Sequence, residues 1–220
     1  MNLPQPQQEK LCKELKPYVF TSHNGWTVLK HPLVFQVPYE DIPLLNIQAN
    51  KMYQYKTQQI QQAKHERNWS LIIWLHERPF RWKAFAKIAA HLHDQEYWNL
   101  FADVWTDSEN IYERATLIRN LLKARSVESR TMMMTEKEKQ VLYNLPDPIT
   151  AWRGTRFARG DHRLSWTLDK DKACWFAKRF RQGTPVVWEA QIFHRDTVAY
   201  LDRRGENEII ALKSKITNIE

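Results

Sequence analysis

Glycine and cysteine are scarce in this sequence, and their scarcity excludes several kinds of site. Only 5 of the 220 residues are glycine, and none of them form the glycine pattern of a P-loop or of a dinucleotide-binding strand–helix turn. The two cysteines, Cys12 and Cys174, are far apart and form no Cys-x-x-Cys pair. A disulfide framework and a cysteine-based zinc site are therefore not expected, and a reducing compartment fits.

Long apolar runs and a secretory signal are missing as well. The longest apolar run, from Leu71 to Leu75, is far shorter than the roughly 20 residues of a membrane-spanning helix. The first residues, Met1 to Pro6, have neither the charged nor the apolar segment of a signal peptide. We therefore expect a cytoplasmic protein with no membrane partner, whether it acts in its own cell or in the cytoplasm of a host cell.

Positive charge, by contrast, is in excess. The formal net charge of +8 favours an anionic partner such as a nucleotide, a nucleic acid or an acidic protein surface. The surplus is spread along the chain rather than gathered in a tail, so it supports a nucleic-acid partner only weakly. With 26% charged and 43% hydrophobic residues the composition is that of a folded protein, and most of the 10 Trp are expected in its core.

The N-terminal two thirds of the chain are predicted to be mainly helical. Residues 1 to 45 are punctuated by proline and favour short strands or an extended arm, and residues 47 to 67 favour a polar surface helix. Further helices are expected from four start signals: Pro79, Asp94, Asp107 or Ser108, and Thr135 with its capping-box partner Glu138. We treat residues 1–145 as one region that docks a substrate or packs over the rest, with its function unknown.

The best boundary in the chain is Pro146-Asp147-Pro148, after which the pattern changes to short strands. In residues 146–220 we expect one helix capped by Asp169 and strands at 149–153, 164–167, 186–193, 197–201, 207–212 and 215–219. The predicted fold class is therefore α+β, with a helical N-terminal region followed by a small mixed, mainly antiparallel split sheet.

Two carboxylates stand at the start of the apolar strand near the C-terminus. Glu206 and Glu208 are separated by one residue, so on a strand they would share a face while Asn207 points to the other. Carboxylates in such a place are costly unless they have partners or a task. The alternative is a solvated strand end.

Four short motifs follow one another in the C-terminal third. They are Arg153-Gly154 at a strand end, Ser165-Trp166-Thr167 on the next strand, Ala173-x-x-Phe176-Ala177 on a helix, and Glu206-Asn207-Glu208 before the apolar strand. Their order and spacing resemble the Arg-Ser-Glu class of mono-ADP-ribosyltransferases, which occurs in bacterial toxins, effectors and phage proteins. The resemblance implies a glycosyltransferase core in residues 146–220 that moves ADP-ribose from NAD+ to a protein side chain and releases nicotinamide.

For NAD binding, the resemblance implies four residues. The planar guanidinium of Arg153 would bind the pyrophosphate in two-pronged fashion, and Gly154 would let the backbone approach the ligand. Ser165 and Thr167 would line the site from the neighbouring strand. The structural alternatives are an ordinary strand-end ion pair for Arg153 and ordinary strand positions for the two hydroxyl residues.

For catalysis, the resemblance implies two glutamates and a serine. Glu208, oriented by Ser165, would stabilise the positive charge that develops on the ribose as the bond to nicotinamide breaks. Glu206 would assist the incoming guanidinium nucleophile, which makes arginine the expected acceptor. NAD+ is a substrate and no metal is required. His91 and His93 lie two apart on a helix and do not face each other as metal ligands would.

Several functions remain open at this point. The first is transfer to an arginine of a target protein, for example in a host cell. The others are an NAD glycohydrolase, transfer to a nucleic acid, and a non-catalytic binding or inhibitor module on the same fold. The second motif lacks the last serine of the family's Ser-Thr-Ser, and Arg203-Arg204 stand where many members have an aromatic. These departures leave the acceptor open.

Overall fold

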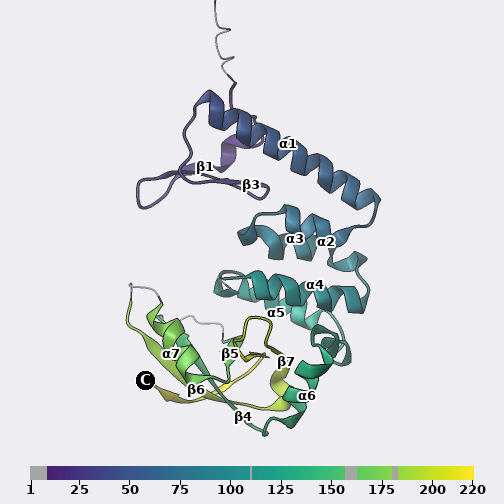
Figure 1. Ribbon diagram of the computed structural model, residues 1–220, viewed down its shortest axis with the longest axis vertical. Helices are drawn as coiled ribbons and strands as arrows, with labels where there is room; N and C mark the ends of the chain where they lie inside the picture. The colour runs from purple at the N-terminus through teal and green to yellow at the C-terminus, as the bar shows by residue number, and fades with distance from the viewer. Residues whose placement is uncertain (1–8, 110, 157–162, 180–182) are drawn as a thin grey trace, which may run out of the picture. The chain divides into compact units, whose positions relative to one another are not determined.

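The computed structural model describes residues 9–109, 111–156, 163–179 and 183–220. The chain forms two compact units, Met1–His91 and Leu92–Glu220. The first unit contains β1 (Val19–Thr21), β2 (Thr27–His31), β3 (Val34–Gln36), α1 (Pro43–His65), α2 (Trp69–Leu75) and α3 (Arg81–Ile88), with short 3-10 helices η1 (Lys16–Tyr18), η2 (Arg78–Phe80) and η3 (Ala89–His91) (Figure 1). The expected short strands and surface helix are thus both present.

The core of the first unit lies between its small sheet and α1. The three strands are antiparallel in the order β1-β2-β3. The buried side chains of this core are Leu11, Leu15, Leu29, Leu33, Val34, Tyr39 and Ala49. Helix α1 begins at Pro43, earlier than predicted, because proline is well suited to the first helical position. No helix within the described ranges is both long and apolar enough to cross a membrane.

The second unit begins with helices and continues with a sheet. Its elements are α4 (Asp94–Asp107), η4 (Ile111–Arg114), α5 (Ala115–Lys123), η5 (Glu128–Met133), α6 (Glu136–Asn144), β4 (Ile149–Thr155), β5 (Ser165–Thr167), α7 (Lys170–Lys178), β6 (Val186–Ile192), η6 (His194–Asp196), β7 (Thr197–Leu201), β8 (Glu208–Ala211) and β9 (Lys215–Ile219). The fold class is α+β, as predicted.

The six strands of this unit form one sheet in the order β7-β8-β5-β4-β6-β9, and every pairing described is antiparallel rather than mixed. Three neighbouring inner strands, β8, β5 and β4, contain or adjoin the predicted Glu-x-Glu, Ser-x-Thr and Arg-Gly motifs. In the register of the sheet, Thr167 pairs with Glu208 on one side and with Trp152 on the other. Helix α7 covers β4 and β6 through Ala173 and Ala177, which pack with Val187 and Trp152.

The boundary between the units lies earlier than the Pro146-Asp147-Pro148 break predicts. Helices α4 to α6 belong with the sheet, because each forms a hydrogen bond to β8, to the residue that follows β8, or to the turn between β7 and β8. Glu138 of α6 accepts from the backbone N–H of Asp202 at 3.0 Å, and Arg119 of α5 donates to the carbonyl of Leu212 at 2.9 Å. The predicted unit of residues 146–220 is therefore only part of a larger unit.

Two helix starts were predicted correctly from their capping side chains. Thr135 and Glu138 form the predicted capping box, and Asp169 accepts from the N–H of Lys172. Two other predicted caps were wrong. His93, not Asp94, caps α4 with its side chain, and the 3-10 helix η4 separates Asp107 and Ser108 from α5, which has no side-chain cap.

Candidate active site

Glu208 is the centre of the candidate site. It is the first residue of β8 and only 8% exposed, which is unusual for a carboxylate. Each of its two oxygens has a donor: Ser165 Oγ donates to Oε1, and the indole Nε1 of Trp105 donates to Oε2 at 2.9 Å. The predicted pairing of Ser165 with Glu208 is thus present, and the indole is a second donor that the motifs did not include.

Burial raises the pKa of the Glu208 carboxyl, because the ionised form loses its hydration. The hydrogen bonds from Ser165 and Trp105 act in the opposite direction, since they stabilise the ionised form. The nearby charges of Glu206 and Arg204 add smaller effects, which raise and lower the pKa respectively. The fold thus places around this carboxyl groups that act on its pKa in opposite directions, an arrangement common at catalytic sites.

Glu206 lies in the turn before β8 rather than on the strand. The strand begins at Glu208, and Asn207 has a positive φ of 46°, so the alternation of faces predicted for Glu206 and Glu208 does not apply. The turn is fixed at its ends: Asn207 donates its N–H to Asp202 Oδ1 at 3.1 Å and accepts from the Tyr200 hydroxyl at 2.7 Å. Glu206 is thereby placed beside Glu208 by turn geometry, and its charge still reaches that carboxyl.

Thr167 holds this turn through its side chain. Its hydroxyl donates to the carbonyl of Glu206 at 2.7 Å and accepts from the N–H of Asp169 at 3.1 Å. The single hydroxyl proton is therefore used within the protein. Thr167 was predicted to bind the cofactor; in the structure it fixes the position of the Glu206 backbone.

Arg153 lies on β4, and its guanidinium donates to the backbone carbonyl of Ser165 at 2.7 Å. The pairing of Trp152 with Thr167 and of Thr167 with Glu208 puts those three residues on one face of the sheet. Because neighbours on a strand alternate, the Arg153 side chain leaves from the opposite face. The structure thus brings Arg153 next to Ser165, and a ligand touching both Arg153 and Glu208 has to pass the end of β5.

Gly154 is required by helix packing. A Cβ at this position would lie 1.8 Å from the carbonyl oxygen of Ala173 and 2.6 Å from the backbone nitrogen of Ala177. On the side of β4 where Gly154 lacks a Cβ, the group that approaches closely is therefore the backbone of α7. Arg156 then ends this helix by donating to the carbonyls of Ala177 and Lys178 at 2.9 and 3.1 Å.

Trp105 is the residue of the site that the motifs missed. It was expected only as a core side chain of α4, and it is indeed buried at 1% exposure. A signal did exist, because a buried indole N–H needs an acceptor and the core offers few. Sequence alone does not say that this acceptor is Glu208, which is 103 positions away.

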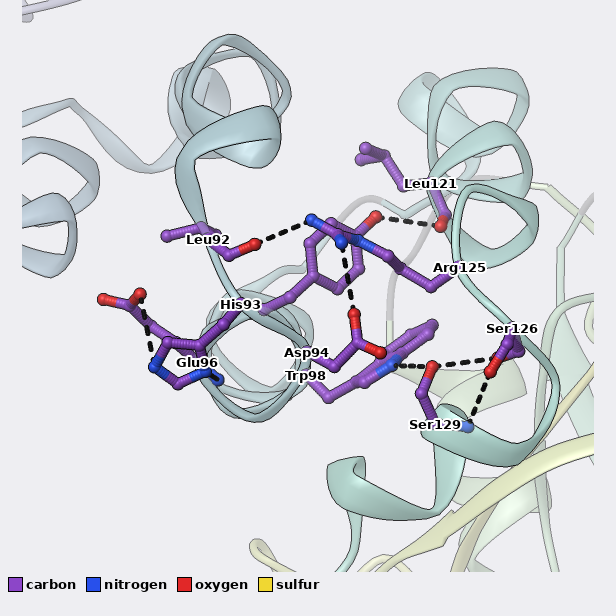
Figure 2. A network of polar contacts seen from close by, with 10 residues as sticks. Leu92, His93, Asp94, Glu96, Trp98, Leu121, Arg125, Ser126 and Ser129 are labelled. Carbon is purple, nitrogen blue, oxygen red and sulfur yellow. Dashed lines mark hydrogen bonds and ion pairs between the residues drawn. The ribbon is translucent and has the colours of Figure 1, made fainter.

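A polar network holds the helix that carries Trp105 (Figure 2). Arg125, just after α5, donates to Asp94 at 3.1 Å and to the carbonyl of Leu92 at 2.8 Å, so it fixes the N-terminal end of α4. One turn along the helix, Trp98 donates its indole N–H to Ser129 at 2.9 Å. These contacts hold α4 in place, and Trp105 donates to Glu208 from the same helix.

Metal ligands do not gather at this site or elsewhere in the described ranges, where no group of three or more His, Cys, Asp and Glu side chains could hold an ion. The two histidines considered above have other roles: the His93 ring caps α4, and the His91 ring stacks on Trp69 with centroids 4.6 Å apart. Comparisons of the chain with family models, with curated proteins and with solved structures find no match.

Proposed function

We propose that the second unit is a mono-ADP-ribosyltransferase that moves ADP-ribose from NAD+ to an arginine of a target protein and releases nicotinamide. The observation that supports the proposal is the environment of Glu208: a buried carboxylate at the first residue of β8, an inner strand of the sheet, with one donor on each oxygen. A carboxylate accepts about four hydrogen bonds, so Glu208 keeps acceptor capacity beyond its two protein donors, and the proposal assigns this capacity to hydroxyl groups of the ribose.

Cleavage of the bond between nicotinamide and ribose builds positive charge on the sugar, and a fixed anion nearby lowers the energy of that state. Glu208 suits this role because its donors, Ser165 and Trp105, hold it in one orientation before substrate arrives. Preorganised charge of this kind needs no rearrangement during the reaction. Arg153, beside Ser165, is the residue that we assign to the pyrophosphate.

The choice of arginine as acceptor rests on Glu206. Its carboxylate already binds a guanidinium, that of Arg204, with Nη2 and Oε2 3.0 Å apart. A carboxylate that accepts one guanidinium in this position can accept another, and it would take up the proton that the nucleophile loses. The reducing cytoplasm that we propose for the reaction agrees with the free thiols of Cys12 and Cys174.

Labelled NAD+ tests the proposal in two steps. The purified protein is first assayed for nicotinamide release, and then for label on protein in a cell lysate, with removal by hydroxylamine as the sign of an arginine linkage. We expect Glu208→Gln to abolish both signals and Glu206→Ala to abolish labelling more than nicotinamide release. Glu189→Gln is the matched control, because Glu189 also accepts an indole N–H in this sheet, from Trp152 at 3.2 Å.

The outcomes separate the competing functions. Nicotinamide release without a labelled protein, and with Glu206→Ala still active, identifies an NAD glycohydrolase. Label that nuclease removes identifies a nucleic-acid acceptor. Absence of both NAD+ binding and nicotinamide release refutes the enzymatic proposal and leaves a binding module.

A further inference from the structure

Three large aromatic side chains are exposed on or beside the small sheet of the first unit. Phe20 on β1, Phe35 on β3 and Trp26, one residue before β2, are 47%, 46% and 54% exposed. One face of this sheet contributes Leu29 and Val34 to the core that it shares with α1 (Figure 1). We call the face turned away from that core the outer face.

The register of the strands places both phenylalanines on the outer face. Phe20 pairs with Val28 and Phe35 pairs with Lys30, and residues that pair across two strands point to the same side of a sheet. Val28 and Lys30 are two positions apart on β2, so they share a face, and Leu29 between them points into the core. Phe20, Phe35 and Lys30 are therefore neighbours on one surface.

Trp26 extends the outer face at the turn between β1 and β2. Its carbonyl accepts the N–H of Ser22 at 2.8 Å, which adds one more pair to the ladder, and Gly25 before it has the positive φ of 83° that the turn requires. Trp26 is two positions before Val28, so alternation places its indole on the outer face. Exposed apolar surface of this extent is typical of an interaction site.

The charge of the first unit indicates the kind of partner. Residues 1–91 have 12 Lys and Arg against 6 Asp and Glu, so this unit carries +6 of the formal charge of +8. The outer face contains no carboxylate, and Lys30 forms no ion pair with a described residue. Exposed aromatic rings suit either an apolar protein surface or nucleobases, and the excess of cations favours the polyanion of the two.

We propose that the outer face of the first unit binds single-stranded nucleic acid. Bases stack on Phe20, Phe35 and Trp26, and Lys30 contacts the phosphates between them. Phe20 and Phe35 lie on either side of β2, roughly 10 Å apart across the sheet, so each ring takes a different base. A duplex does not fit, because its bases are stacked on one another and hide their faces. This function belongs to a different unit from the proposed transferase and does not depend on it.

Fluorescence anisotropy of the purified full chain, without NAD+, tests the proposal. The probes are labelled oligo-U and oligo-dT of roughly 12 nucleotides, a length within the usual site size of such surfaces, and the duplex of oligo-dT with its complement. We expect the single strands to bind more tightly than the duplex. A preference for oligo-U or for oligo-dT identifies RNA or DNA as the ligand. Phe20→Ala and Phe35→Ala should each weaken single-strand binding by about fivefold or more, because each removes one stacking contact.

Further variants separate stacking from apolar contact and from charge. Phe35→Tyr keeps an aromatic ring and should bind like the wild type, whereas Phe35→Leu keeps an apolar side chain and should bind as weakly as Phe35→Ala. Lys30→Gln should reduce the slope of log K against log salt concentration by about 0.7, the contribution of one phosphate contact in a single strand. Tyr55→Ala is the matched control, because Tyr55 is 58% exposed but lies on α1. Circular dichroism establishes that the variants are folded.

Several results would refute the proposal. It is wrong if neither single strand binds at low ionic strength, or if the duplex binds as tightly as the single strands do. It is also wrong if Tyr55→Ala weakens binding as much as Phe35→Ala, since the charge of the unit then acts without the outer face. Wild-type affinity in Phe35→Leu would exclude stacking. A wild-type dimer that Phe35→Ala converts to a monomer, in sedimentation without nucleic acid, would assign the outer face to a second copy of the chain.

Discussion

Replacing Trp105 with phenylalanine would show whether the indole stabilises the ionised form of Glu208. Trp105 is buried and donates from Nε1 to Oε2 of Glu208 at 2.9 Å. Phenylalanine fills most of the same space but has no N–H, so the variant loses one hydrogen bond to a buried carboxylate. A hydrogen bond to a charged group contributes about 1.5–3 kcal/mol, against about 0.5–1.5 kcal/mol for a neutral pair.

The chain offers a matched control in Trp98→Phe. Trp98 lies on the same helix, is fully buried, and also donates its indole N–H at 2.9 Å, but to the neutral hydroxyl of Ser129. Both variants lose the same atoms, so the packing losses largely cancel when the two are compared. At mildly alkaline pH we expect Trp105→Phe to lower the free energy of unfolding by about 1–1.5 kcal/mol more than Trp98→Phe does.

This difference should depend on pH. Burial raises the pKa of Glu208, so in the folded protein the carboxyl becomes neutral as pH falls through that raised value. The indole then donates to a neutral group, and the extra cost of Trp105→Phe shrinks towards that of Trp98→Phe. Denaturant unfolding of both variants across the acidic and alkaline range measures the difference. A difference that does not change with pH, or a greater loss in Trp98→Phe at alkaline pH, would refute the reasoning.

Two further predictions concern stability. Glu208→Gln should raise the free energy of unfolding at alkaline pH, by about 1.4 kcal/mol for each unit by which folding raises the Glu208 pKa. At pH values between the unfolded and folded pKa of Glu208, the folded wild type keeps a proton that the unfolded chain has released. The free energy of unfolding of the wild type therefore falls as pH rises through this range. Denaturant unfolding should show that the difference in free energy of unfolding between the variant and the wild type grows with pH over the same range. A less stable Gln variant at alkaline pH contradicts this. Gly154→Ala should cost about 3 kcal/mol or more, because its Cβ would lie 1.8 Å from the Ala173 carbonyl oxygen. Gly25→Ala, whose Cβ meets nothing within 4 Å, should cost only the strain of its φ of 83°, about 1–2 kcal/mol by thermal unfolding.

Local patterns predicted most of the strands of the second unit. The segments 197–201 and 215–219 have the predicted bounds, and β4 and β6 differ from theirs by one or two residues. Each has a run of apolar or β-branched residues between turn signals, which are properties of the residues themselves. Boundaries that depend on packing were predicted less well: the division between the units lies at His91 and not at the prolines after Leu145.

The candidate site was predicted in part. The contact of Ser165 with Glu208 follows from two strands that are neighbours, and the resemblance suggested it. Glu206 was expected on a strand and lies in a turn, because Asn207 adopts a left-handed conformation that alternation cannot foresee. The assignment of Thr167 and Gly154 to a ligand stays a prediction; within the protein, Thr167 holds the turn and Gly154 allows the close contact with α7.

By itself the sequence determined the α+β class, the order of the elements in the C-terminal third, and the caps at Thr135 and Asp169, because these depend on residues within a few positions of each other. Only the tertiary structure decided that Trp105 donates to Glu208, and that α4 to α6 join the sheet. Such contacts join segments far apart in the chain. Their free energy comes from the burial and hydrogen bonding of both partners together, and neither segment carries that information alone.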